Sequence, residues 1–280
     1  MHPVRVETRA GSFAALELGS GPGTLICLHG FPDTPRSFAP LAHFLAPGGW
    51  KVVMPWMRGY APSTLEGPFD PRRLGDDLVA LADALSPDAP VAVVGHDWGA
   101  VATYAALAAA PERFSRAVTI AVPHPASFLA NVRRHPRQLG RSGYMALFQL
   151  RALSDGALRF RDFALVDRLW KRWSPGFFPT QEHLAEVKRC LAESLPAPLE
   201  MYRDSARAFA RGERFPDEKI RVPVLHLQGA DDGCVGPELS DGEERYFASQ
   251  FRRDVLPEVG HFLHLERPAA VARRVLEWLQ

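Results

Sequence analysis

The segment from Val91 to Ala110 constrains the fold of this chain more than any other. A short apolar run, Val91 to Val94, leads into Gly95-His96-Asp97-Trp98-Gly99, and an alanine-rich stretch follows that ends before Pro111. An apolar run this short is typical of a strand buried on both faces, and the alanine-rich stretch is typical of a packed helix. The glycines allow a tight turn between the two and place Asp97 at its tip. The same pattern also fits a strand followed by an ordinary helix that Asp97 caps.

The rest of the chain repeats this alternation of strands and helices. Further short apolar runs are typical of buried strands and lie at residues 24–28, 51–54, 117–121, 222–227 and 253–256. Helical spacing of apolar residues follows Asp70-Pro71 and Pro268, where a proline suits the first helical turn. Such alternation predicts an α/β fold with a mostly parallel central sheet covered on both faces. The 280 residues, of which 46% are hydrophobic, are enough to bury this core.

The middle of the chain differs from its two ends. From about residue 125 to residue 215, the sequence shows helical patterns broken by prolines and no clear strand. Between residues 131 and 215, basic residues outnumber acidic ones by 16 to 9. We interpret the excess charge as a solvated helical surface. The sequence therefore predicts an α/β core made of residues 1–122 and 216–280, with residues 123–215 inserted as a helical lid.

Composition argues against several classes of partner. A net charge of +1 does not favour nucleic acid, which needs a basic surface. The three cysteines, Cys27, Cys190 and Cys234, are far apart, which argues against a disulfide framework and a cysteine zinc site. No signal peptide and no apolar run long enough for a membrane span is found. We expect a cytoplasmic protein without cofactor, metal, membrane or nucleic-acid partner, and the sequence leaves a homodimer open.

Asp97 stands where a strained turn would project a side chain above the sheet. A carboxylate is already an anion at neutral pH, so it needs no base to act as a nucleophile. Attack on a saturated carbon would give an ester, which water can hydrolyse at the carbonyl of the carboxylate. A serine alkylated in the same way would become an ether, which water would not cleave. Asp97 therefore favours alkyl transfer followed by hydrolysis.

Two later segments offer partners for this nucleophile. One apolar run ends in Gly229-Ala230-Asp231-Asp232, where either carboxylate could orient a base, although such a pair also forms plain turns. Shortly before the last predicted helix, Val259-Gly260-His261-Phe262 offers His261 as the base, with His264 as a competitor. The order nucleophile, acid, histidine is one of the known orders of a catalytic triad.

An early turn completes this set of candidate residues. Leu28-His29-Gly30-Phe31-Pro32 follows the first predicted buried strand. An oxyanion hole needs one backbone N–H from such a loop and one from the residue after the nucleophile. These are the N–H groups of Phe31 and Trp98.

Taken together, these motifs resemble those of epoxide hydrolases of the α/β-hydrolase superfamily. The matching pieces run from about Thr24 to the C-terminus and include residues 29–32, Arg58-Gly59-Tyr60 followed by Ser63, residues 95–99, residues 229–232 and residues 260–261. The resemblance implies Asp232 rather than Asp231 as the acid, His261 rather than His264 as the base, and a cis bond between Phe31 and Pro32. Ala61-Pro62 departs from the family pattern in one loop.

The resemblance also implies two lid tyrosines that donate hydrogen bonds to the epoxide oxygen. Tyr144-Met145-Ala146-Leu147-Phe148-Gln149 is similar to the first such segment of the family, and Tyr202-Arg203 is similar to the second. The chain has only five tyrosines, and two fall at these places. We expect Trp98, Phe148 and Trp170 to contact the substrate, because the lid is rich in aromatic residues.

The implied activity is hydrolysis of an apolar epoxide to a vicinal diol, with water as the second substrate and a role in detoxification. Two other readings stay open. A haloalkane dehalogenase would share Asp97 but needs donors for a halide, usually Trp98 together with an asparagine or a second tryptophan. Phe31 stands where the asparagine would serve, while Trp170 or Trp173 in the lid could supply the second tryptophan. A non-catalytic ligand-binding protein would be expected to lack the acid or the histidine, and neither is missing.

Overall fold

A single sheet organises the molecule, with strand order β1-β2-β4-β3-β5-β6-β7-β8. The computed structural model describes residues 1–215 and 218–280, so the core boundary predicted at residue 216 lies outside the described residues. The strands are β1 (His2–Thr8), β2 (Gly11–Leu18), β3 (Gly23–Leu28), β4 (Trp50–Pro55), β5 (Val91–His96), β6 (Phe114–Ile120), β7 (Val224–Gly229) and β8 (Phe251–Leu256). β2 runs antiparallel to β1 and β4, and all other neighbours are parallel. The predicted fold class is confirmed.

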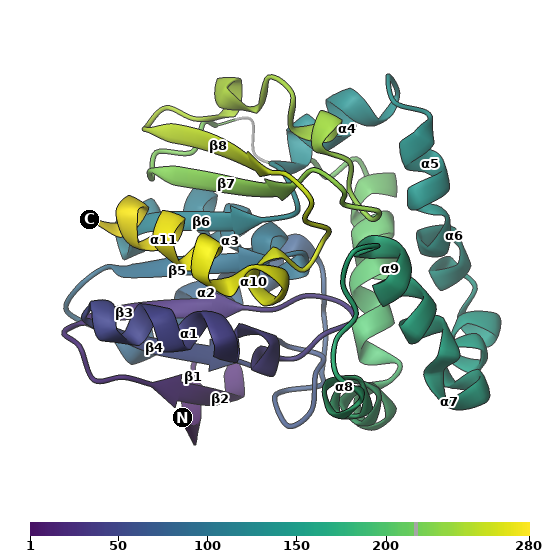
Figure 1. Ribbon diagram of the computed structural model, residues 1–280, viewed down its shortest axis with the longest axis horizontal. Helices are drawn as coiled ribbons and strands as arrows, with labels where there is room; N and C mark the ends of the chain where they lie inside the picture. The colour runs from purple at the N-terminus through teal and green to yellow at the C-terminus, as the bar shows by residue number, and fades with distance from the viewer. Residues whose placement is uncertain (216–217) are drawn as a thin grey trace.

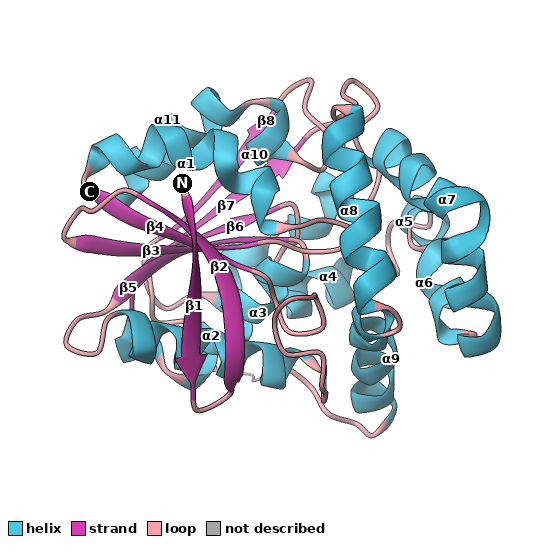
Figure 2. Cartoon of the chain, turned by 90° about the horizontal axis from the view of Figure 1, so that it is seen from below, coloured by secondary structure: helices cyan, strands magenta, loops and turns pink. Residues whose placement is uncertain are grey.

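Helices cover both faces of this sheet (Figure 2). One face carries α1 (Ala39–Leu45), α10 (Leu263–Glu266) and α11 (Pro268–Leu279), and the other carries α2 (Pro71–Leu85) and α3 (Trp98–Ala109). Neighbouring strand residues point to opposite faces, as in β5, where Val93 packs with α2 and α3 and Val94 packs with α1 and α11. Both faces are therefore apolar, which explains the continuous apolar runs of the parallel strands.

Between β6 and β7 the described chain forms helices rather than strands. They are α4 (Pro125–Val132), α5 (Arg137–Arg141), α6 (Gly143–Gln149), α7 (Arg151–Trp173), α8 (Gln181–Ser194) and α9 (Ala197–Ala210). Pro136, Pro175, Pro179 and Pro196 stand at or near the ends of these helices. Figure 1 shows α5 to α9 gathered beyond one end of the sheet. In the described ranges, no helix is both long and apolar enough to cross a membrane.

Arg203 on α9 ties three of these helices together. The residue is only 2% exposed, and its guanidinium donates to the Phe148 carbonyl at the end of α6 at 2.8 Å. It also donates to Ser154 on α7 at 2.6 Å and to Glu200 on its own helix at 2.6 Å. A buried arginine with this many partners fixes the angles between the helices, because the planar guanidinium can bond to all of these acceptors only when the helices are in one arrangement.

We expect Arg203→Met to lower the free energy of unfolding by about 3–5 kcal/mol, because it leaves the buried Glu200 carboxylate without its closest partner. Arg207 provides a matched control, since it also pairs with Glu200 but is 48% exposed. Arg207→Met should cost less than about 1 kcal/mol. Urea unfolding followed by fluorescence measures both. Equal losses would contradict the role given to Arg203.

Candidate active site

Asp97 lies in a strained turn between β5 and α3. Its backbone has φ 52° and ψ −116°, a conformation that costs a non-glycine residue about 1–3 kcal/mol. A Cβ at Gly95 would overlap the carbonyl of Gly99, and a Cβ at Gly99 would overlap the carbonyl of Leu28. The Gly-x-x-x-Gly spacing therefore permits the close approach of strand and helix that holds the turn. The carboxylate projects at the end of the sheet beyond β5.

The turn after β3 reaches the Asp97 carboxylate from the other side. The backbone N–H of Phe31 donates to Oδ1 of Asp97 at 2.8 Å. The bond between Phe31 and Pro32 is cis, as expected from the sequence. Trp98 begins α3, so its backbone N–H is one of those that an α-helix leaves without an intrahelical partner. Of the two predicted oxyanion donors, the Phe31 N–H contacts the carboxylate directly, and the Trp98 N–H directly follows Asp97 in the chain.

His261 and Asp232 meet beside this turn. Nδ1 of His261 lies 2.8 Å from Oδ2 of Asp232, and Nε2 of His261 lies 3.7 Å from Oδ2 of Asp97. The backbone N–H groups of Cys234 and Val235 donate to Oδ1 of Asp232 at 2.7 and 2.8 Å. His261 and Asp232 are fully buried. The structure thus brings together Asp97, His261 and Asp232, the three residues predicted to form a triad.

The competing residues lie elsewhere. Asp231 is exposed. His264 stacks on Phe38 and lies 3.1 Å from Oγ of Ser37. Neither one contacts the Asp97 carboxylate among the described hydrogen bonds and ion pairs.

The charge of His261 depends on its two carboxylate neighbours. Burial alone would lower the pKa of this imidazole, but Asp232 and then Asp97 outweigh burial and raise the pKa to about 10. The two carboxylates therefore favour the imidazolium form of His261 in the free protein. Loss of the Asp97 charge would remove one of the two groups that raise the pKa, so alkylation of Asp97 moves His261 toward the neutral form that can accept a proton.

We expect Asp97→Ala to lower the pKa of His261 relative to the unchanged protein, because an anion 3.7 Å from Nε2 is lost. Titration of ¹³C-labelled histidine by NMR measures this pKa, with the resonance assigned from a His261→Gln spectrum. Asp241→Ala is a suitable control, since Asp241 is 60% exposed and pairs with Arg253. An unchanged or higher pKa in Asp97→Ala would contradict the assigned coupling.

No sequence motif predicted the part played by the end of α7. The carbonyl of Trp173 accepts the N–H of Gly233 at 3.1 Å and the N–H of His261 at 3.0 Å. Oγ of Ser174 also accepts from the N–H of His261, at 3.0 Å, and donates to Glu266 at 2.6 Å. The loops that carry the acid and the histidine are therefore held by one end of an inserted helix.

A cavity of about 600 Å³ opens beside the triad, and Asp97, Trp98, Tyr144 and Tyr202 all line it. The tyrosine rings are 5.8 Å apart and nearly perpendicular. The Tyr144 hydroxyl lies 3.6 Å from Sγ of Cys234, and the buried Tyr202 hydroxyl has no partner among the described residues. Burial raises the pKa of both tyrosines well above the ordinary value, so both hydroxyls keep their protons.

Two of the predicted substrate contacts do not line this cavity. Phe148 is fully buried and packs edge-on against Phe31 and Tyr202. Trp170 is also fully buried, stacks on Phe262, and donates its Nε1–H to the Pro32 carbonyl at 3.0 Å. Both side chains pack behind the residues that line the cavity. Of the three predicted substrate contacts, Trp98 alone lines the cavity.

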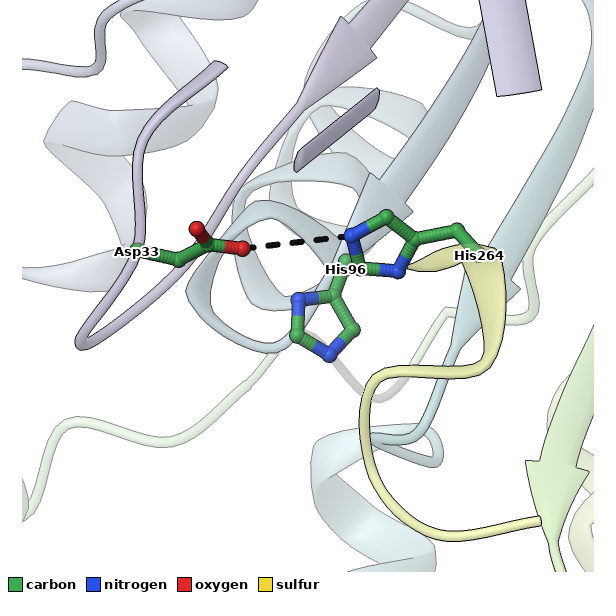
Figure 3. Close-up of side chains that lie close together, drawn as sticks. All are labelled: Asp33, His96 and His264. Atoms are coloured by element: carbon green, nitrogen blue, oxygen red, sulfur yellow. Dashed lines mark ion pairs between the residues drawn. The ribbon is translucent and has the colours of Figure 1, made fainter. Parts of the chain in front are cut away.

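A second polar cluster lies behind the triad, formed by Asp33, His96 and His264 (Figure 3). One ligand atom from each falls within 4.8 Å of the others, and Nε2 of His264 lies 3.9 Å from Oδ2 of Asp33. Zinc ligands lie about 2.0–2.2 Å from their ion, so these side chains would have to move closer to share one. Burial lowers the pKa of His264 to about 4, while His183 on α8 pairs with Asp33 at 3.4 Å. The cluster thus links α8 to the core.

Comparison with known proteins agrees with this geometry. The model of the alpha/beta hydrolase family matches residues 25–274 of the chain. The chain belongs to this family. Within it, the protein is 29% identical to the AB hydrolase superfamily protein YfhM of Bacillus subtilis, over 91% of this chain and 90% of that one. It is 27% identical to an epoxide hydrolase of Caballeronia sordidicola, over 98% of this chain and 92% of that one.

Solved structures show the same fold for this α/β-hydrolase. Epoxide hydrolase A of Mycobacterium thermoresistibile superposes with a TM-score of 0.84, at 23% identity, over 99% of this chain and 98% of that one. An epoxide hydrolase of Bacillus megaterium gives a TM-score of 0.87 at 21% identity, over 99% of each chain. The resemblance to epoxide hydrolases indicated by the sequence motifs is confirmed.

Proposed function

We propose that this α/β-hydrolase is an epoxide hydrolase that works through a covalent ester on Asp97. The observation that carries the proposal is that a carboxylate nucleophile and two protonated tyrosines line one cavity, with a buried histidine–carboxylate pair beside them. The epoxide hydrolases among its relatives support the same activity.

The first step opens the ring. Oδ2 of Asp97 forms a bond to one epoxide carbon, and the C–O bond of that carbon breaks. The electron pair of this bond goes to the ring oxygen, which accepts hydrogen bonds from Tyr144 and Tyr202 and then a proton from one of them. Oδ1 becomes the carbonyl oxygen of the new ester and already accepts the Phe31 N–H at 2.8 Å.

The second step hydrolyses the ester. Nε2 of His261, oriented by Asp232 through Nδ1, accepts a proton from water, and the oxygen of this water attacks Cγ of Asp97. Negative charge develops on Oδ1, where the N–H groups of Phe31 and Trp98 stabilise it. The bond between Cγ and Oδ2 then breaks, and Oδ2 leaves with the diol after taking the proton from the His261 imidazolium. Asp97 retains the oxygen of the water, and the remaining proton of this water returns to the tyrosine that gave one up in the first step.

Residues 123–215 would act as the cap of this site. Tyr144 on α6 and Tyr202 on α9 come from this segment, as does the carbonyl of Trp173 that holds the histidine loop. The core of residues 1–122 and 216–280 would supply the nucleophile, acid and histidine. The cytoplasmic location and the homodimer stay predictions.

A single turnover in ¹⁸O-labelled water tests the proposal. With enzyme in excess over styrene oxide, the diol should form without label and Asp97 should gain it, because the new hydroxyl oxygen comes from the carboxylate. Label in the diol at the first turnover would contradict the ester. Bromoalkanes assayed in parallel should release no bromide at a comparable rate, and efficient bromide release without diol would identify a dehalogenase instead.

A further inference from the structure

The Asp97 carboxylate faces an open cavity on one side and tightly packed side chains on the other. Toward β3 and the end of α7 it is filled by large aromatic side chains, all with 4% exposure or less and none of them lining the cavity: Phe31, Phe148, Trp170, Trp173 and Phe262. Trp170 and Phe262 stack with ring centroids 3.5 Å apart, and Phe31 packs against Phe148 at 5.3 Å. Packing of this kind leaves no room for a substituent on that side.

This aromatic wall is also held in place. Nε1 of Trp170 is bonded to the Pro32 carbonyl, and the backbone of Trp173 holds both Gly233 and His261. A shift of the Trp173 backbone would break the hydrogen bonds that position the histidine loop. The wall is therefore anchored at both tryptophans, through the Trp170 side chain and the Trp173 backbone.

On the other side, the cavity follows α3 away from Asp97. Val101 and Ala108 line it from α3, and Ser205 and Ala208 line it from α9. These side chains are small, which leaves a channel between the two helices. From Asp97 to Ala108 a helix rises about 16 Å at 1.5 Å per residue, so the channel is long as well as apolar.

The channel leads to solvent at its far end. Leu129 on α4 is 42% exposed and Phe209 on α9 is 49% exposed, and both line the cavity. The charged residues Asp70, Arg72, Glu213 and Arg214 also line the cavity, and the Arg214 guanidinium lies over the Phe209 ring. The site thus joins one closed side to one long and mostly apolar channel that opens to solvent.

From this shape we propose that the enzyme selects terminal epoxides that carry one long, unbranched apolar substituent. The inference rests on the proposed epoxide hydrolysis. The ring would lie against Asp97 and the two tyrosines, its unsubstituted CH₂ would face the aromatic wall, and its single chain would run along the channel. Epoxides substituted on both carbons would have to push one substituent into the wall.

A panel of matched epoxides tests this selection. For 1,2-epoxyalkanes of six to twelve carbons, kcat/KM should rise by about fourfold per methylene until the channel is filled, the factor that corresponds to burying one CH₂. The internal 5,6-epoxydecane should be at least about tenfold poorer than 1,2-epoxydecane, because added methylenes are poorly tolerated by a packed wall. Equal kcat/KM for these two isomers would overturn the inference and leave epoxide hydrolysis standing. Absence of diol from every epoxide would overturn both.

Two leucine variants on α9 locate the channel. Ala208 is buried and lines it, while Ala206 lies on the same helix and is exposed. Ala208→Leu should lower the ratio of kcat/KM for 1,2-epoxydodecane to that for 1,2-epoxyhexane by at least about tenfold, because the added methylenes block the chain. Ala206→Leu should leave the ratio unchanged. An unchanged ratio in a folded Ala208→Leu protein, or an equal change in both variants, would place the chain elsewhere and overturn the inference.

Discussion

His261→Gln protein mixed with an epoxide substrate will gain the mass of one substrate molecule and keep it. Attack by Asp97 does not need His261 as a base, whereas hydrolysis of the ester does. Loss of a general base typically slows such a step by about 10²–10⁴-fold, so the ester accumulates. Intact mass spectrometry after seconds and after hours measures its formation and decay, and peptide mapping should place the added mass on Asp97.

Two variants serve as controls for this experiment. Asp97→Ala should gain no mass, because the nucleophile is absent. His264→Gln changes a nearby histidine on α10, which lies beside Ser37 rather than Asp97, and should turn over without accumulating an ester. An unmodified His261→Gln protein, given a substrate that the unchanged enzyme hydrolyses, would exclude the proposed intermediate.

Tyr144→Phe and Tyr202→Phe together should nearly abolish ring opening. The oxygen of the opened ring develops the charge of an alkoxide, which is strongly basic and needs a proton. Removal of one preorganised donor typically costs about 2.7–4 kcal/mol, or about 10²–10³ in rate. Two donors to one oxygen partly replace each other, so each single change should cost less than this and the double change more. Stopped-flow measurement of ester formation reports the step directly.

Tyr246 provides a matched tyrosine outside the cavity. Its hydroxyl donates to the Ala126 carbonyl at 3.3 Å, so Tyr246→Phe should keep the rate of ester formation. A halide leaves as a stable anion and needs no proton, so a dehalogenase would tolerate the loss of Tyr144 and Tyr202. If the double variant turned over the best epoxide at the original rate, Tyr144 and Tyr202 could not be the proton donors.

The sequence predicted the parts of the site that depend on local backbone geometry. Glycines must flank Asp97 because strand and helix approach too closely for a Cβ, and this requirement is visible in one chain without any structure. Buried parallel strands likewise need continuous apolar runs. The antiparallel pair β1 and β2 was not predicted. Polar and apolar residues alternate in β1, and the apolar run of β2, Phe13 to Leu16, is only four residues long and includes two alanines, which are not typical of strands.

The aromatic residues of the inserted helices could not be placed in the same way. Phe148 and Trp170 are residue types that often contact apolar substrates. Which side of a helix faces a cavity, however, depends on how the helices pack. The hydrogen bonds of Trp173 use its backbone, so no side-chain pattern signals them. Ser174, which supports the same loop, is one of three serines next to a proline, and no sequence pattern distinguishes it from Ser63 and Ser86.

Exchange of the cap between homologues is a common idea for changing selectivity in enzymes built from a core and an insertion. In this protein the last turn of α7 contributes a carbonyl that two core loops share, those of Gly233 and His261. A transplanted cap that misplaces this carbonyl would release the histidine as well as reshape the pocket. Chimeras of this enzyme should therefore keep residues 170–174 with the core, and their junctions belong within α7 rather than at its end.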